Sequence, residues 1–275
     1  MSIPFVGVLT LIRKDLLLRL IQSIDYPVDQ FVILFQGGVA DFDLSCIKNT
    51  HVKEFVFVSS DMNIGVSRGW NYLIRNFPSN YWIISGDDNY FESGTLERIS
   101  QFMDKEDSLQ NVFCGINMRQ RLEEDTSTEN HSYKVIPAGF STFIVTSKIF
   151  ENVGLFDENI YPAYFEDSDL WQRITLSGER THTIENTFIY AGDNKDTGSC
   201  TIRNVSAEYR RKMDTCYCRN EKYFHDKWNT NETVSFTQPF GNNNYSIYAA
   251  IPHENYYKNQ EILLGHQREP NISII

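Results

Sequence analysis

The first 90 or so residues alternate between short apolar runs and segments with helical periodicity. The apolar runs, rich in β-branched and aromatic residues, are PFVGVLTLI, QFVILFQGG, KEFVFVSS and YWIISGDD, and two helical patterns between them are KDLLLRLIQSI and VSRGWNYLIRNF. Strands that alternate with helices are joined by crossovers and run parallel in one sheet. Because the runs are almost continuously apolar, helices are expected to cover both sheet faces. The pattern predicts an α/β fold with a mostly parallel sheet flanked by helices.

The chain beyond this region continues with further strand and helix patterns. A helix is expected from Ser93 to Met103, a strand at NVFCGINM, a hairpin-like pair in YKVIPAGFSTFIVTS, and a strand at RTHTIENTFIYAG. From about residue 195 the pattern changes to a long charged helix, about Val205 to Trp228, and then to polar, aromatic sequence with little periodicity. We therefore expect a C-terminal helical and irregular lobe packed on the α/β part.

The charge balance excludes one class of partner. The chain carries 25 Lys and Arg against 36 Asp and Glu, a formal net charge of −11. A protein that binds nucleic acid through its phosphates needs an excess of cations, so no nucleic-acid partner is expected. No apolar run approaches the roughly 20 residues that span a bilayer, so no membrane span is expected either. These features predict a soluble cytoplasmic protein.

Polar residues follow the predicted strands, where open parallel sheets bind their ligands. The strand YWIISG runs directly into Asp87 and Asp88, and Thr10 and Gln36 end two other strands. Adjacent carboxylates at a strand end can hold a hard divalent cation such as Mg2+ or Mn2+ through oxygen. The alternative is an ordinary turn, since Gly, Asp and Asn are common turn residues.

The segment MNIGVSRGWN enters a predicted helix and carries Asn63 and Arg68 near its start. Free amides at a helix start, together with a guanidinium, can bind a phosphate or the edge of a nucleobase. A helix cap with a surface arginine explains the same residues.

The segment YFEDSDLWQR places Glu166, Asp167 and Asp169 at the start of a helix. The helix dipole favours acids there by only about 0.3 to 1 kcal/mol each. That effect explains why an acid occurs at the start of the helix. Asp169 is expected to cap the helix, and Arg173 is expected to orient the acids. It does not explain the preceding aromatic residues, which suit a sugar face and raise the pKa of a buried carboxylate.

Taken in order, these segments resemble the GT-A glycosyltransferases of the family 2 type. The matching pieces are VGVLTLIR, NIGVSRGWN, ISGDDN, PAGFSTFIVTSKIFENVGLFDENI and YFEDSDLWQRITLSG, so the resemblance spans residues 3–192. It implies a GT-A catalytic domain over residues 1–195, with a donor half of about 1–90 and an acceptor half of about 91–195, and a C-terminal helix and extension over 196–275. The implied activity is transfer of a hexose or pentose from a nucleotide sugar to a hydroxyl of an oligosaccharide or glycoprotein glycan, with inversion at the anomeric carbon. The resemblance extends to soluble bacterial or virus-encoded enzymes, and a virus-encoded one would act in the host cytoplasm.

The resemblance also assigns roles to individual residues. Asp167 takes the place of the catalytic base, and Asp87 and Asp88 take the place of ligands of Mn2+ or Mg2+ on the diphosphate. The predicted donor-binding residues are Thr10, Arg13, Gln36, Asn63, Arg68 and Asp87, and the predicted acceptor-binding residues are Gly139, Glu166 and Trp171.

Three positions depart from the family pattern. Ser85 stands where the first acid of the DxD motif is usual, Gln36 stands where the second strand commonly ends in Asp, and IYAGDN lacks the histidine that often follows this strand. Gln36 offers a donor and an acceptor to uracil, so UDP is the expected nucleotide, with dTDP and GDP as alternatives. A catalytically inactive nucleotide-sugar or glycan-binding protein is the second hypothesis. A nucleotidyltransferase is the third, although LTLIRKDLL lacks the glycines of its usual phosphate loop.

Overall fold

A computed structural model of the chain describes residues 1–11, 13–38, 42–105, 112–121, 133–192, 206–228 and 254–275. Its strands form one ten-stranded sheet in the order β10-β3-β2-β1-β4-β8-β6-β9-β5, with β7 paired to β6. The strands are β1 Ile3–Thr10, β2 Val28–Gln36, β3 Val52–Ser60, β4 Tyr81–Gly86, β5 Asn89–Phe91, β6 Val112–Arg121, β7 Tyr133–Pro137, β8 Thr142–Thr146, β9 Arg180–Ala191 and β10 Ile272–Ile274. Strands β1 to β4 are parallel to their neighbours among themselves, as are β6 and β9, which confirms the predicted α/β architecture.

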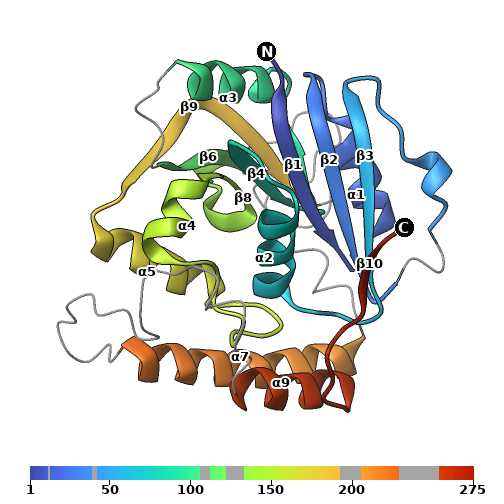
Figure 1. Ribbon diagram of the computed structural model, residues 1–275, viewed down its shortest axis with the longest axis vertical. Helices are drawn as coiled ribbons and strands as arrows, with labels where there is room; N and C mark the ends of the chain where they lie inside the picture. Colours follow the sequence, from blue (N-terminus) through green and yellow to red (C-terminus); the bar gives the residue numbers. More distant parts are fainter. Residues whose placement is uncertain (12, 39–41, 106–111, 122–132, 193–205, 229–253) are drawn as a thin grey trace.

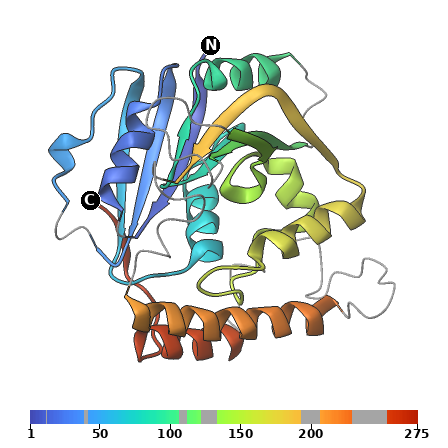
Figure 2. The same ribbon diagram turned by 180° about the vertical axis from the view of Figure 1, so that it is seen from behind.

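Helices cover both faces of this sheet (Figures 1 and 2). They are α1 Lys14–Gln22, α2 Val66–Asn76, α3 Thr95–Asp104, α4 Ser147–Val153, α5 Glu166–Ser177, α7 Ala207–Trp228 and α9 Glu254–Leu264, with short 3-10 turns η1 Leu44–Cys46 and η3 Gly139–Ser141. Apolar side chains of α1 and α3 pack in one core cluster on one face, and those of α2, α4 and α5 pack in a second cluster on the other. In the described residues, no helix is both long and apolar enough to cross a membrane.

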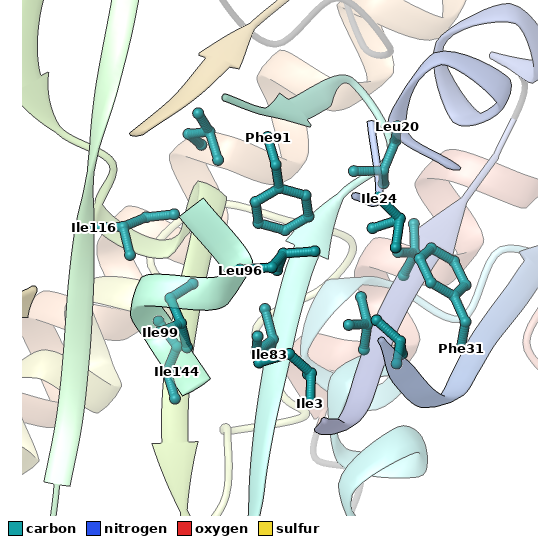
Figure 3. Close-up of a cluster of buried hydrophobic side chains, with 14 of the residues drawn as sticks. Ile3, Leu20, Ile24, Phe31, Ile83, Phe91, Leu96, Ile99, Ile116 and Ile144 are labelled. Carbon is teal, nitrogen blue, oxygen red and sulfur yellow. The ribbon is translucent and has the colours of Figure 1, made fainter. Parts of the chain in front are cut away.

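The strand sequences divide between these two cores. In β2, Phe31 and Ile33 belong to the α1/α3 cluster, whereas Val32 and Leu34 belong to the other one. Alternate side chains of a strand point to opposite faces, so a strand covered on both sides must be apolar throughout. Figure 3 shows the first cluster, in which Leu96 of α3 lies against the sheet.

The predicted hairpin over residues 133–147 is wrong. Strand β6 pairs with β9 along one edge, and along its other edge it pairs with β8 at Phe113 to Gly115 and with β7 at Asn117 to Arg121. β7 and β8 therefore follow one another along the same edge of β6, and the turn η3 separates them. The turn thus redirects the chain along the sheet instead of folding β8 back onto β7.

The C-terminal lobe packs against the α/β part. Helices α7 and α9 lie side by side along one end of the molecule, and β10 returns to pair antiparallel with β3 (Figures 1 and 2). The predicted helix of about 205–228 is confirmed as α7. The predicted domain boundary at residue 195 lies outside the described residues.

A buried ionic cluster joins α7 to the α/β part. Lys227 Nζ lies 2.8 Å from Asp157 Oδ2 and 2.6 Å from Asp169 Oδ1, and all three side chains are at most 2% exposed. Arg173 binds the other oxygen of Asp169 at 2.8 Å, and the Trp228 indole donates to Asp169 at 2.9 Å. Two acids and two bases balance in charge, so the cluster is stable only when complete.

Substituting Lys227→Met should lower the free energy of unfolding by about 3 to 5 kcal/mol, because two carboxylates stay buried with one arginine between them. Lys222→Met is the matched control on the same helix. Lys222 pairs with Asp226 on the surface, where the side chains are 75% and 64% exposed. Its loss should cost less than about 0.5 kcal/mol. Urea unfolding followed by circular dichroism measures both, and equal effects would contradict this account of the cluster.

Candidate active site

A cavity of about 170 Å³ lies at the carboxyl ends of β1, β2 and β4; we call it the β4 cavity. Its lining includes Gln36, Asn63, Asp87 and Asp88, four of the residues that the sequence predicts to bind a donor or a metal. Two residues that the sequence analysis did not identify, Tyr209 and Met213 of α7, also line it. The carboxyl-end rule therefore brings the predicted polar groups together, and the C-terminal lobe contributes a wall.

Asp87 and Thr10 are joined at the centre of this strand end. Asp87 is only 5% exposed, and its Oδ2 accepts a 2.7 Å hydrogen bond from Thr10 Oγ1. A side chain on Gly86 would bring Cβ to 2.9 Å from Asp88 Oδ1, so glycine permits the close approach of the acid pair to the backbone.

The acid pair fits a divalent cation that is shared with a ligand. The described residues contain no group of three or more His, Cys, Asp or Glu side chains that would hold a metal by themselves. Mg2+ and similar ions in phosphate sites are commonly held by one or two carboxylates together with the oxygens of the bound phosphates. Asp87 and Asp88 in one cavity match that donor set.

The opposite side of the β4 cavity carries two side-chain amides. Gln36 Oε1 accepts from the Ile64 amide at 3.0 Å. Asn63 Oδ1 accepts from the Gly65 amide at 2.8 Å, while its Nδ2 donates to the Tyr209 hydroxyl at 3.1 Å. The contact with the Ile64 amide identifies Oε1 as the acceptor of the Gln36 side chain. The N–H donors of Gln36 are therefore on Nε2.

Three predicted donor-binding residues do not line this cavity. Thr10 is connected to it through its hydrogen bond to Asp87, whereas Arg68 and Arg13 make their contacts elsewhere. Arg68 forms an ion pair with Glu269 at 2.6 Å and donates to the Tyr256 hydroxyl at 3.2 Å, which ties α2 to the C-terminal lobe. Arg13 precedes α1 and pairs with Asp15 at 2.9 Å. Their roles in donor binding stay predictions without support from their placement.

A second cavity, of about 370 Å³, lies between α5 and strands β6 and β9; we call it the β6 cavity. It contains three predicted residues, the base Asp167 and the acceptor-binding Gly139 and Trp171. Phe140 and His182 also line it. Neither of these two was predicted from the sequence. Phe140 lies in the turn η3, inside a segment that reads as a hairpin, and His182 lies in β9, which reads as an ordinary strand.

The two cavities are neighbours along the sheet. The turn η3 contributes Gly139 and Phe140 to the β6 cavity, and its last residue, Ser141, accepts a 2.7 Å hydrogen bond from Asn89 next to the acid pair. The segment 162–168 likewise lines the β4 cavity with its first residues and the β6 cavity with its last. The two cavities therefore share the segments that separate them.

The three acids that open α5 have different environments. Glu166 is 7% exposed, and burial together with the neighbouring charge of Asp167 raises its pKa to about 8. Glu166 Oε2 makes no hydrogen bond within the described part of the chain. Asp167 is partly exposed to the β6 cavity, and its Oδ1 accepts from the Ser168 amide at 2.7 Å.

Asp169 belongs to the buried ionic cluster, so its expected role as a helix cap is wrong. Phe165 occupies the N-cap position, in a left-handed conformation with φ of 77°. Of the three acids that Arg173 is expected to orient, the structure shows its contact with Asp169, to which both Nε and Nη2 donate. Asp167 is thus the one acid of the three that faces a cavity.

Buried asparagines of the C-terminal lobe hold the segment before these acids. Asn220 Nδ2 donates to the carbonyls of Tyr161 and Ala163 at 3.1 and 3.0 Å, and Asn259 Nδ2 donates to Tyr161 at 2.8 Å. Both asparagines are fully buried. Since a buried amide without partners is costly, these bonds fix the path of the chain into α5.

Sequence comparisons give no match, whereas structure comparisons find proteins of similar fold. Neither the protein-family profiles nor the curated proteins match the sequence. TarS from S. aureus in complex with UDP-GlcNAc matches with a TM-score of 0.52 at 13% identity, over 82% of this chain and 71% of that one. Mannosyltransferase PcManGT from Pyrobaculum calidifontis, in complex with GDP-Man and Mn2+, matches with a TM-score of 0.52 at 14% identity, over 94% and 71%. At such identities the likeness concerns the fold alone, and the fold is the GT-A-like one that the sequence resemblance predicts.

The stability of the protein should fall as the pH rises from about 5 to 8. Burial raises the pKa of Glu166 to about 8 and that of Glu158 to about 7, from 4.5. The folded state then holds protons that the unfolded state releases, so this stability is complete below pH 4.5 and is lost as the pH passes the folded pKa. Glu166→Gln should make the fall in the free energy of unfolding with pH less steep, by up to about 1.4 kcal/mol per pH unit.

Urea unfolding at half-unit steps of pH measures this slope. Glu158→Gln serves as the comparison, because it keeps Glu166 and should retain the fall between pH 7 and 8. A Glu166→Gln variant with the slope of the wild-type protein would show that Glu166 is not protonated in the folded state.

Proposed function

We propose that this protein is an inverting glycosyltransferase that moves a sugar from a nucleotide sugar to a hydroxyl of a glycan. The observation that carries the proposal is the adjacency of two cavities, one with the Asp87 and Asp88 carboxylates and the other with Asp167. The GT-A-like fold supports it, as do the nucleotide sugars bound by TarS and PcManGT.

The proposed donor lies across the strand ends. The sheet order β3-β2-β1-β4 separates Gln36 and Asn63, at β2 and after β3, from the acid pair after β4. Gln36 at β2 is two strand spacings, about 10 Å, from β4, and Asn63 after β3 is three, about 14 Å, which are lengths over which a nucleoside diphosphate can extend. The nucleobase then lies at the amides and the diphosphate at the acids. The Gln36 Nε2 donor suits a base carbonyl, so we propose UDP as the nucleotide, with dTDP and GDP as the alternatives.

Asp87 and Asp88 are the residues proposed to hold Mn2+ or Mg2+. When bound there, such an ion neutralises negative charge on the diphosphate oxygens. The hydrogen bond from Thr10 fixes one oxygen of Asp87, which keeps that carboxylate oriented toward the cavity it lines.

The proposed acceptor occupies the β6 cavity, where Asp167 serves as the general base. A carboxylate within hydrogen-bond reach takes the proton of the attacking hydroxyl. The hydroxyl oxygen forms a bond to the anomeric carbon, and the bond from that carbon to the phosphate oxygen breaks, with its electron pair leaving on the nucleoside diphosphate. Attack from the face opposite the leaving group inverts the anomeric configuration.

The lining of the β6 cavity supports a sugar as the acceptor. Trp171 is 45% exposed and packs edge-on against Phe113, with ring centroids 6.0 Å apart, so one face of the indole remains available. Phe140 provides a second aromatic wall. Rings with an apolar body and a polar edge suit a sugar, which has apolar C–H faces between its hydroxyls. Glu166, the third predicted acceptor-binding residue, lines neither cavity, so its contact with the acceptor stays a prediction.

Asp167→Asn should lower the rate of sugar transfer by about a hundredfold or more, because the amide cannot accept the proton of the attacking hydroxyl. Nucleotide binding should be unchanged, since Asp167 lines the β6 cavity and not the β4 cavity. Asp87→Asn should instead weaken nucleotide binding in the presence of Mn2+. Asp214→Asn, an exposed residue of α7, is the control.

Release of UDP from UDP-sugars, followed by NMR of the product anomer, provides the measurement. Undiminished transfer by Asp167→Asn would remove Asp167 from the mechanism, and a retained anomeric configuration would contradict inversion. Nucleotide binding without transfer to any glycan would favour a binding protein of the same fold.

A further inference from the structure

Helix α7 contributes side chains to the β4 cavity as well as to the packing of the C-terminal lobe. Tyr209 and Met213, one helical turn apart on the same face of α7, line the β4 cavity together with Gln36 and Asn63. Met213 is 3% exposed, and Tyr209 is half-buried. The tyrosine is in the first turn of the helix, where its hydroxyl accepts from Asn63 Nδ2 at 3.1 Å.

This contact identifies the end of the cavity that α7 covers. Asn63 follows β3, and β3 lies on the far side of β2 and β1 from β4, which carries the acid pair. Tyr209 therefore stands at the amide end and not at the carboxylate end. A flat aromatic ring and a polarisable thioether at the amide end offer apolar area to a planar group.

We propose that Tyr209 and Met213 form the wall on which the nucleobase of the donor packs. This inference rests on the proposed function and adds a recognition element from the C-terminal lobe. The base lies between this wall and the Gln36 and Asn63 amides, which supply the polar contacts to its edge. The lobe thereby becomes part of the donor site, and the same helix carries Lys227 in the buried ionic cluster.

The contacts around Asn63 support this role for Tyr209, although Tyr209 belongs to the C-terminal lobe. The Asn63 backbone carbonyl accepts from the Tyr161 hydroxyl at 2.9 Å, and Asn220 of α7 holds the Tyr161 carbonyl. Asn63 is thus bound by two groups, Tyr209 and Tyr161, that α7 positions. A wall fixed in this way is preorganised for a planar ligand, which lowers the entropic cost of binding.

The test compares two probes by calorimetric titration of the full chain with Mn2+ present. The first probe is UDP, with dTDP and GDP in parallel, and the second is inorganic pyrophosphate, which has no base. Tyr209→Ala should weaken nucleoside diphosphate binding by about 5- to 150-fold, the range that corresponds to loss of one base–aromatic stack. Pyrophosphate binding should change less than about threefold. Tyr209→Phe keeps the ring and should stay within about threefold for both probes.

Two further variants keep the result interpretable. Tyr257→Ala removes another tyrosine of the same lobe, one whose hydroxyl binds Glu269 and which does not line the cavity, and it should bind both probes as the wild-type protein does. Tyr209→Leu keeps apolar bulk without a flat ring, and it replaces Tyr209→Ala if that variant does not fold.

The outcomes separate this inference from the proposed function. Equal loss of nucleotide and pyrophosphate binding, or unchanged nucleotide binding, in Tyr209→Ala or Tyr209→Leu would overturn the assignment of the wall while leaving the donor site in place. Failure of the wild-type protein to bind any of the three nucleotides would overturn the proposed function and, with it, this inference.

Discussion

The contact of Lys227 with two buried aspartates holds the two parts of the molecule in one structure. Asp157 precedes the segment that carries the acids, and Asp169 lies inside α5, so the lysine of α7 fixes both ends of that segment. The charges balance only when Arg173 is included. Because an unpaired charge in such a site costs several kcal/mol, the lobe cannot separate from the α/β part without a large penalty. The geometry of the site therefore depends on a contact whose residues line neither cavity.

This arrangement gives three neighbouring acids three different environments. Asp169 is part of the ionic cluster, Glu166 is buried with its pKa raised to about 8, and Asp167 faces the β6 cavity. The three side chains differ in their surroundings, although they are close together in the sequence. Across the sheet, strand order separates the amides after β2 and β3 from the acid pair after β4, whereas the proposed base Asp167 comes from α5 and lines the cavity beside β6 and β9.

The sequence predicted the parts of this structure that local rules govern. Alternating apolar runs and helical patterns identify the sheet and its covering helices, and the carboxyl-end rule brings Gln36, Asn63 and Asp87 to one cavity. The missed parts depend on contacts between distant residues. Tyr209 bonds to Asn63 across 146 positions, and Lys227 bonds to Asp157 across 70. The charged pattern of α7 gives no sign of either contact, because each of them uses single polar residues on a helix that otherwise reads as solvated.

In the proposed complex a nucleotide sugar lies along the strand order, with its base at β2 and β3, its diphosphate at β4 and the acceptor toward β6. A crystal structure of the protein with UDP and Mn2+ tests it most directly. Uracil is expected between the Gln36 and Asn63 amides and α7, and the metal between the diphosphate and Asp87 and Asp88. Electron density that places the nucleotide elsewhere, or in the reverse direction with the base at the acids, would contradict this arrangement.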